Sequence, residues 1–201
     1  MRHRRKGRVL GRNPSHQRAL LRNLASALFL TEIDKDSMLT RRRREGFDIE
    51  SNAPKVPGRM VTTLEKAKEV RPVVERCITL ACRSLKAAEG AKEFATSADR
   101  GSAEWKAWRK SEKHAKWVAA TMPLVNARRK CLVMLGDKQA VNVLFERVAP
   151  RFSDRPGGYT RVLRLAKPRL GDAGTRAIIE FVGVRDRAAK KVKAAKPSFD
   201  S

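Results

Sequence analysis

The sequence is poor in acidic residues. Its 201 residues include 21 Asp and Glu against 46 Lys and Arg, so the formal net charge is +25 at pH 7. A charge of that size repels itself and implies an acidic partner, either nucleic acid or an anionic membrane. No stretch approaches the roughly 18 consecutive apolar residues of a spanning helix, and no apolar signal core follows the charged start. We therefore expect a cytoplasmic protein that has no membrane partner.

Cysteine is also scarce. Cys77, Cys82 and Cys131 form an odd set without regular spacing, which argues against a disulfide framework and favours reduced thiols. Cys77 and Cys82 together with His114 could in principle hold a metal. Burial as small apolar side chains is the interpretation that we favour, so we predict no metal site.

Groups for acid–base catalysis are few and scattered. His3 and His16 lie near the N-terminus, whereas His114 is far along the chain, so converging acids and bases are not indicated. Glu65 and Glu69 are one helical turn apart but stand among lysines, which is typical of surface pairing. We predict no enzymatic activity, no cofactor and no small-molecule substrate.

The chain instead has a basic arm at its start. Residues 1–12 carry six Arg and Lys without an acid, and the first carboxylate is Glu32. An unpaired guanidinium is too costly to bury, whereas arginine forks match phosphate oxygens. A solvated arm without function is the alternative. We predict a nucleic-acid-binding arm whose contact residues are Arg2, His3, Arg4, Arg5, Lys6, Arg8 and Arg12.

A helix is predicted directly after the arm, over residues 14–30. Asn13 suits an N-cap and Pro14 the first helical position. Arg18 and Arg22 lie off the apolar stripe and face outward, where we expect them to contact nucleic acid. His16 could bind a phosphate at the helix N-terminus or could be an exposed cap residue; we include it among the candidates.

The middle of the chain contains two interrupted stretches. Residues 32–57 lack periodicity and suggest an exposed insertion, whose four arginines are either a second phosphate-binding patch or merely solvated. We favour binding by Arg41, Arg42, Arg43 and Arg44. A short strand over 58–63 then leads into a helix, with Thr62 and Glu65 spaced as a capping box.

That helix extends to about Leu85 despite Pro72. Residues 86–122 form a separate region rich in alanine, lysine and glutamate. It contains three tryptophans, Trp105, Trp108 and Trp117, on a predicted helix that begins near Ser102. They could stack on bases, but packing against a neighbouring helix is more common.

The C-terminal third alternates helices and strands. Pro123 is expected to break a helix, and Gly136 to end the next one over 126–135. Asp137 should cap a further helix that ends at Pro150. Strands are predicted over 159–166 and 175–182, joined by a basic loop, and the basic tail 184–201 should be disordered unless bound.

These elements predict the α+β class, with a small mixed sheet covered by helices on one face as a two-layer α/β domain. We expect one domain over 13–183, preceded by the arm 1–12 and followed by the tail 184–201. The other basic residues expected to contact nucleic acid are Arg59, Lys66, Arg155, Arg161, Lys167 and Arg169.

Three stretches resemble a known family. They are residues 1–24 in most positions, residues 62–75, and residues 149–161 followed by the strand 177–182. Each is similar to the seventeenth protein family of the bacterial large ribosomal subunit. The resemblance implies a two-layer α/β domain, a structural role on large-subunit ribosomal RNA near the polypeptide exit, and contacts with neighbouring ribosomal proteins. The insertions 32–57 and 86–125 depart from the family pattern.

We therefore predict a structural, RNA-binding constituent of the large ribosomal subunit that acts in subunit assembly and translation. A DNA-binding or nucleoid-associated basic protein is the alternative, although the sequence shows no helix-turn-helix or zinc-finger spacing. An RNA-modifying or RNA-cleaving enzyme is the third and weakest hypothesis.

Overall fold

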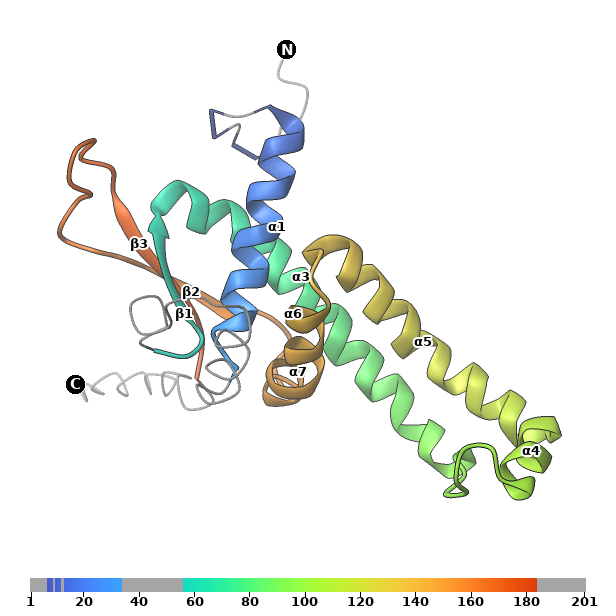
Figure 1. Cartoon of the computed structure of the whole chain (residues 1–201). Helices are drawn as coiled ribbons and strands as arrows, with labels where there is room; N and C mark the ends of the chain where they lie inside the picture. Colours follow the sequence, from blue (N-terminus) through green and yellow to red (C-terminus); the bar gives the residue numbers. More distant parts are fainter. Residues whose placement is uncertain (1–6, 9, 12, 34–55, 184–201) are drawn as a thin grey trace, which may run out of the picture.

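The computed structural model describes residues 7, 8, 10, 11, 13–33 and 56–183. Helices and strands follow one another along the chain as follows (Figure 1): α1 (Pro14–Leu30), β1 (Arg59–Thr63), α3 (Leu64–Ala88), the 3-10 helix η1 (Glu89–Phe94), α4 (Ala103–Lys110), α5 (Glu112–Leu135), α6 (Lys138–Val143), the π-helical turn η2 (Leu144–Val148), α7 (Ala149–Arg151), β2 (Thr160–Arg164) and β3 (Arg176–Phe181). The prediction of an α+β fold is confirmed.

The three strands form one sheet in the order β1-β3-β2. Both neighbouring pairs are antiparallel, so the sheet is not the mixed one that we predicted. The short connection between β2 and β3 forces these strands to run in opposite directions. β1 then joins the free edge of β3 and also runs opposite to it, which leaves no parallel neighbours.

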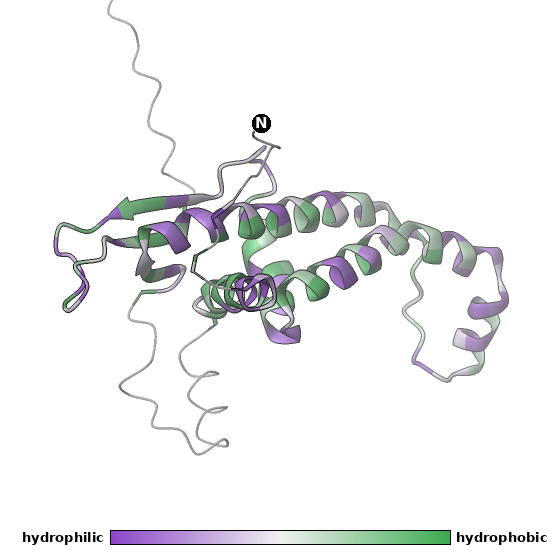
Figure 2. Cartoon of the chain, turned by 90° about the horizontal axis from the view of Figure 1, so that it is seen from above, coloured by the Kyte–Doolittle hydropathy of each residue, from purple (hydrophilic) through white to green (hydrophobic). Residues whose placement is uncertain are grey.

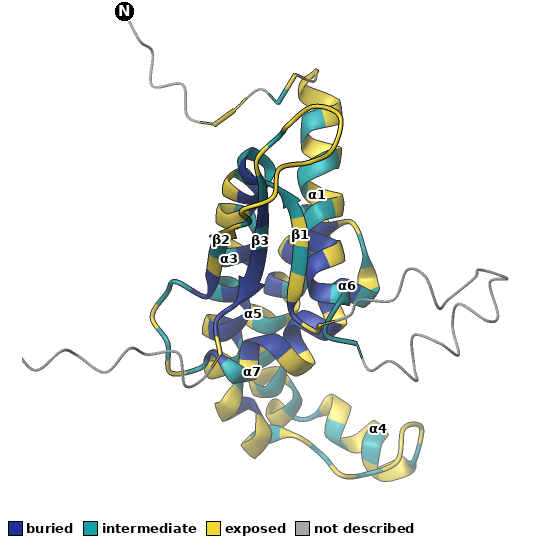
Figure 3. Ribbon diagram, turned by 90° about the vertical axis from the view of Figure 1, so that its left-hand side faces the viewer, coloured by how far each residue is buried: buried dark blue, intermediate teal, exposed yellow. Residues whose placement is uncertain are grey.

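One face of the sheet meets the helices, and the other stays open (Figures 1 and 3). Ala177, Ile179 and Phe181 alternate along β3 and belong to the core. The open face presents Val61 and Leu163, which are 49% and 39% exposed. The result is two layers, a sheet and a group of helices, as the alternation of the strands predicts.

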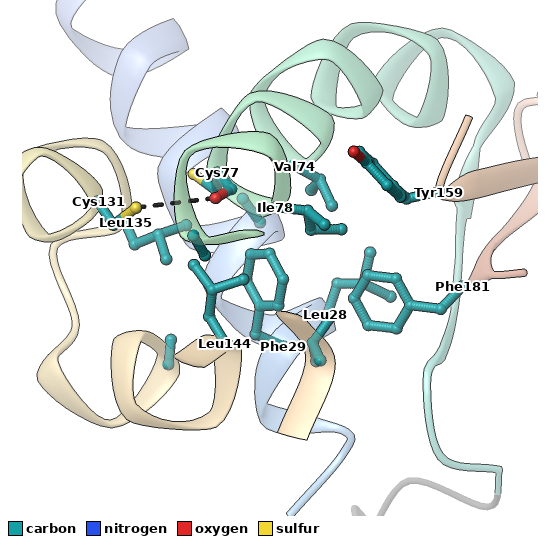
Figure 4. Packing of buried hydrophobic residues seen from close by; sticks show 14 of the residues in the cluster. Leu28, Phe29, Val74, Cys77, Ile78, Cys131, Leu135, Leu144, Tyr159 and Phe181 are labelled. Carbon is teal, nitrogen blue, oxygen red and sulfur yellow. Dashed lines mark hydrogen bonds between the residues drawn. The ribbon is translucent and has the colours of Figure 1, made fainter. Parts of the chain in front are cut away.

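The core is organised around α3. Val70, Val74 and Ile78 of this helix are completely buried, and Figure 4 shows Val74 and Ile78 among Leu28 and Phe29 from α1. The Phe29 ring stacks on Phe181 with centroids 5.5 Å apart, which joins α1 to the sheet. Such stacked aromatic rings contribute beyond their buried area.

The two longest helices, α3 and α5, lie side by side and extend away from the sheet, with α4 near their far end (Figures 1 and 2). Hydrophilic and hydrophobic residues alternate along both helices (Figure 2), as expected for helices with one solvated face. No helix in the described ranges is long and apolar enough to cross a membrane.

All three cysteines are buried and free, as predicted. The Cys131 thiol of α5 donates to the Cys77 carbonyl oxygen of α3 at 3.9 Å (Figure 4). A hydrogen bond with Cys131 and burial together raise the pKa of the Cys77 thiol, so it stays protonated. Burial likewise raises the pKa of Cys82. These thiols act as small core residues.

The helix starts agree with the sequence signals in three places. The Asn13 side chain accepts from the His16 backbone N–H, Ser102 accepts from Trp105, and Asp137 accepts from Gln139 and Ala140. These contacts satisfy amides that a helix leaves free in its first turn.

The capping box at Thr62 and Glu65 is wrong. The N-cap of α3 is Thr63, whose side chain makes no capping hydrogen bond. The helix follows β1 without a linker, and the Leu64 N–H donates to the Thr175 carbonyl at 3.0 Å. This hydrogen bond to the residue just before β3 thus replaces the bond that a side-chain cap would make.

The break at Pro123 is also wrong, because α5 runs through this proline to Leu135. Pro123 and Ala119, whose carbonyl loses its helical donor, are both exposed, so water can hydrate that carbonyl. Packing of Ala127, Cys131 and Leu135 in the core outweighs the roughly 3 kcal/mol that an internal proline costs. The chain breaks earlier, at Ser111 between α4 and α5.

Gly136 generates a prediction about stability. It ends α5 with φ +73, and a Cβ there would lie 2.7 Å from Cδ of Arg22. We expect Gly136→Ala to lower the free energy of unfolding by about 1–2 kcal/mol, because an L-residue is strained in this left-handed conformation. Thermal unfolding of the full chain measures the change. The matched variant Gly90→Ala meets no atom within 4 Å and should unfold at or above the wild-type temperature; equal loss in both variants would contradict the prediction.

Candidate nucleic-acid interface

A groove with basic sides lies where α1, α3 and α5 meet. One hollow of about 610 Å³ is lined by Arg18 and Arg22 of α1 together with Arg76 of α3. A second, of about 500 Å³, shares Arg76 and adds Arg129 and Lys130 of α5. Val133 and Met134 line both hollows. We call these five charged residues and the surface between them the basic groove.

The helices position these charges by burying their other faces. Arg18 and Arg22 are one turn apart on α1, whereas its Ala25, Leu28 and Phe29 are completely buried. α1 is also fixed to the end of α5 through a hydrogen bond, in which the buried Ser26 hydroxyl donates to the Leu135 carbonyl at 2.7 Å. Two helices remote in sequence therefore present their cations to one space.

The basic groove has no internal neutralisation. All five cations are exposed, and no carboxylate stands among the described residues that line either hollow. Closely spaced like charges raise the free energy of the free protein. A polyanion relieves that repulsion, and arginine forks can contact its phosphates in pairs. The groove is thus suited to a phosphate backbone.

Arg59 and Arg161, both predicted to bind RNA, are brought together by the sheet on either side of Glu180. Arg59 Nη2 lies 2.6 Å from Glu180 Oε2, and Arg161 Nη2 lies 2.6 Å from Glu180 Oε1. The Glu180 side chain is only 5% exposed, whereas those of the arginines are 40% and 45% exposed. Part of the donor capacity of both guanidinium groups is therefore used within the protein.

Arg169 is similarly paired in the β2–β3 loop. Its guanidinium bonds to both carboxylate oxygens of Asp172, and the Gly174 N–H donates to the same carboxylate at 3.2 Å. These bonds hold the pKa of Asp172 well below its usual range. Lys167 of this loop is exposed, so its ammonium group is more available to an anionic partner than the paired guanidinium of Arg169.

The remaining described candidates lie apart. Arg155 Nε donates to the Gly157 carbonyl at 3.1 Å, which orders the turn before β2, and the residue also lines a hollow of about 310 Å³ with Arg83 and Lys86. Lys66 is half-buried in the first turn of α3, and His16 is exposed near the start of α1.

Only a small part of the basic arm belongs to the described residues. Arg8 Nε lies 3.8 Å from a Glu69 carboxylate oxygen of α3, and the Gln17 side-chain amide donates to the Arg8 carbonyl. A half-exposed ion pair at this distance contributes little. Arg2, His3, Arg4, Arg5, Lys6, Arg12 and Arg41 to Arg44 lie outside the described residues.

Sequence reasoning missed three members of the basic groove: Arg76, Arg129 and Lys130. Each is an exposed residue on a helix whose sequence indicates only a role in packing. The packing of α3 and α5 against α1 brings these three residues near Arg18. The adjacent pair Arg129 and Lys130, with Arg128 before it, was the one local signal in the sequence. Within the described ranges no group of three or more His, Cys, Asp or Glu could hold a metal.

Comparison with known proteins adds independent information. The family model described as ribosomal protein L17 matches residues 56–182. A large ribosomal subunit protein bL17 of Rhodopirellula baltica is 60% identical over 200 residues, which cover 100% of this chain and 89% of that protein. Proteins of the same description from Nitratidesulfovibrio vulgaris and Thermomicrobium roseum are 35% and 34% identical over 97% and 90% of this chain and 96% and 99% of theirs.

The Glu180 cluster generates a second prediction. Glu180→Gln removes a buried charge that two arginines bond, and each hydrogen bond to a charged group contributes about 1.5–3 kcal/mol when well enclosed. Because both arginines are partly solvated, we expect a loss of about 1–3 kcal/mol in the free energy of unfolding, measured by urea denaturation.

The control is Asp172→Asn, which removes the carboxylate of an exposed pair and should leave the denaturation midpoint nearly unchanged. A Glu180→Gln protein as stable as the wild type would show that the cluster is not structural.

Proposed function

The chain belongs to the ribosomal protein L17 family, and on that premise we propose that it binds ribosomal RNA through phosphate contacts as a structural constituent of the large subunit. The family match and the relatives' descriptions support the ribosomal role directly. They also agree with the prediction that the chain is not an enzyme, since the relatives are ribosomal proteins. A role in subunit assembly and translation forms part of the proposal.

The observation that carries RNA binding is the basic groove. Its five exposed cations come from three helices and have no carboxylate beside them in the described lining. RNA that follows the groove would release condensed counterions as phosphates are neutralised. The half-buried apolar floor at Leu21 and Met134 offers contact to ribose, so both components of a backbone can be accommodated.

The basic segments at the ends extend this surface in our proposal. The arm 1–12 would bind RNA through its arginines, the domain 13–183 would anchor it, and the tail 184–201 and Arg41 to Arg44 would add phosphate contacts. His16, Arg59, Lys66, Arg155, Arg161, Lys167 and Arg169 remain candidate contacts. Neighbouring large-subunit proteins are further partners, and the ribosome is the expected location.

The DNA-binding alternative has less support. A major-groove reader concentrates its specific contacts on one recognition helix, whereas the basic groove takes two residues from α1, one from α3 and two from α5. Such a distribution suits an irregular RNA surface, where shape and phosphate contacts dominate.

The proposal predicts a specific salt dependence. Replacing Arg18, Arg22 and Arg76 with Gln should reduce the magnitude of the slope of log K against log salt concentration by about 2–3, because each lost phosphate contact lowers it by roughly 0.7–0.9. The measurement is a salt titration of the full chain with large-subunit ribosomal RNA.

The matched control replaces Lys92, Lys106 and Lys110 with Gln, which removes the same charge from exposed positions remote from the groove. Its slope should change by less than one unit. If both triple variants lose the same slope, net charge rather than the groove accounts for binding.

A further inference from the structure

The far end of the α3–α5 pair carries a second, chemically different hollow. It measures about 390 Å³ and is lined by Arg100, Trp105, Trp108, Arg109, His114 and Trp117, among others. All of them come from residues 86–125, the stretch that the sequence predicts to be an insertion. Binding sites for small organic groups typically have such volumes, from about 300 Å³ upward, with aromatic walls and a few polar groups.

The connection between α3 and α5 is longer than the link that two packed antiparallel helices need. Two packed antiparallel helices are commonly joined by about 2–8 residues, whereas here η1, α4 and their loops lie between Ala88 and Glu112. None of the three tryptophans belongs to the main core. Residues 89–117 therefore build an aromatic cluster of their own, which lies outside the main core.

Three of the rings hold one another. Trp108 forms T-shaped contacts with His114 at 4.8 Å and with Trp117 at 5.5 Å, and His114 stacks on Trp117 at 6.0 Å between centroids. Trp108 Nε1 also donates to the Phe94 carbonyl at 3.1 Å, which joins α4 to η1. This cluster explains how the tip stays folded, and of the three tryptophans only Trp105 lies outside it.

Trp105 makes no ring contact with this cluster. Among the described residues, the indole ring of Trp105 makes one contact of this kind, a cation–π contact with Arg109. The guanidinium carbon of Arg109 lies 5.1 Å from the ring centroid. Arg109 and Arg100 form no ion pair within the described part of the chain. A half-buried indole with a guanidinium over it, beside a second free guanidinium, is a stacking surface for a base with cations available for its phosphate.

The charge of the tip favours a base over a stretch of backbone. Residues 89–117 contain seven Lys and Arg and five Asp and Glu, so their net charge of +2 is small beside that of the whole chain. Phosphate contacts alone would bind weakly here. Stacking is less dependent on charge, and substitution data assign it about 1–3 kcal/mol per base.

We propose that the hollow at the tip binds one unpaired nucleobase of ribosomal RNA, stacked against Trp105 and Arg109 with Arg100 near its phosphate. The proposal rests on the proposed function, because it takes RNA as the partner. A purine is favoured over a pyrimidine, since its larger face gives more stacking area.

The test separates base stacking from phosphate binding. The full chain is titrated with a labelled adenosine hexanucleotide and with an abasic ribose-phosphate oligomer of equal charge. We expect the wild type to bind the first about 5–150-fold more tightly, the ratio that 1–3 kcal/mol of stacking gives. Trp105→Ala should reduce this ratio to nearly one while leaving the binding of the abasic oligomer unchanged.

Two further variants control for folding and charge. Trp105→Phe retains a ring and should keep most of the ratio, and Lys106→Gln, an exposed neighbour that does not line the hollow, should keep all of it. A wild-type ratio of one, or a Trp105→Ala protein that retains the wild-type ratio, would overturn the proposal.

The outcome also distinguishes this proposal from the broader one. Salt-dependent binding of both oligomers with a ratio of one would overturn only the base site. Loss of salt-dependent binding to both would overturn the proposed function. If the tip instead contacts a neighbouring ribosomal protein, the ratio is one and Trp105→Ala abolishes a protein–protein crosslink in isolated large subunits.

Discussion

Burial of the apolar face of α3 is the constraint on which the structure depends. The sheet covers one part of this helix and α5 another, while Phe29 of α1 reaches across to Phe181. Because Cys77 and Ile78 must point inward, the preceding Arg76 must point outward, between α1 and α5. The cation that joins the two hollows of the basic groove is thus positioned by packing, without any local signal for binding.

The distribution of acids explains why the groove stays cationic. Glu180, the most enclosed carboxylate among the described residues, bonds arginines of the two edge strands. Glu32, 14% exposed, bonds Arg151 at 3.1 Å and so links the end of α1 to α7. Arg151 in turn lies over Phe152 and Phe181, where its charge would be costly without that partner. These carboxylates pair with arginines of the sheet and of α7, whereas no carboxylate lines either hollow of the basic groove in the described residues.

Local chemistry made much of the fold predictable. Asn13, Gly136 and Asp137 act within a few residues of their own position, so a single sequence reveals them. The errors at Thr62 and Pro123 have one cause: a remote contact, with Thr175 or with the core, outweighed the local preference. The groove shows the same limit, since Arg18 was predicted from its helix face, whereas its neighbours depend on how three helices pack.

The two proposed contacts differ in how they depend on geometry. Phosphates recur along any RNA, so a cationic groove tolerates displacement along the backbone and determines affinity more than position. The base-stacking hollow, by contrast, accepts one particular unpaired base and so fits the RNA at a single position. α3 ends at Ala88, 12 residues after Arg76, which is about 18 Å at 1.5 Å per residue. Its buried contacts with α5 hold the tip at a fixed distance from the groove. In the proposed complex, this rigid connection between the phosphate-binding groove and the base-stacking hollow fixes the position of the protein on the RNA. A flexible insertion of the same composition would not fix that position.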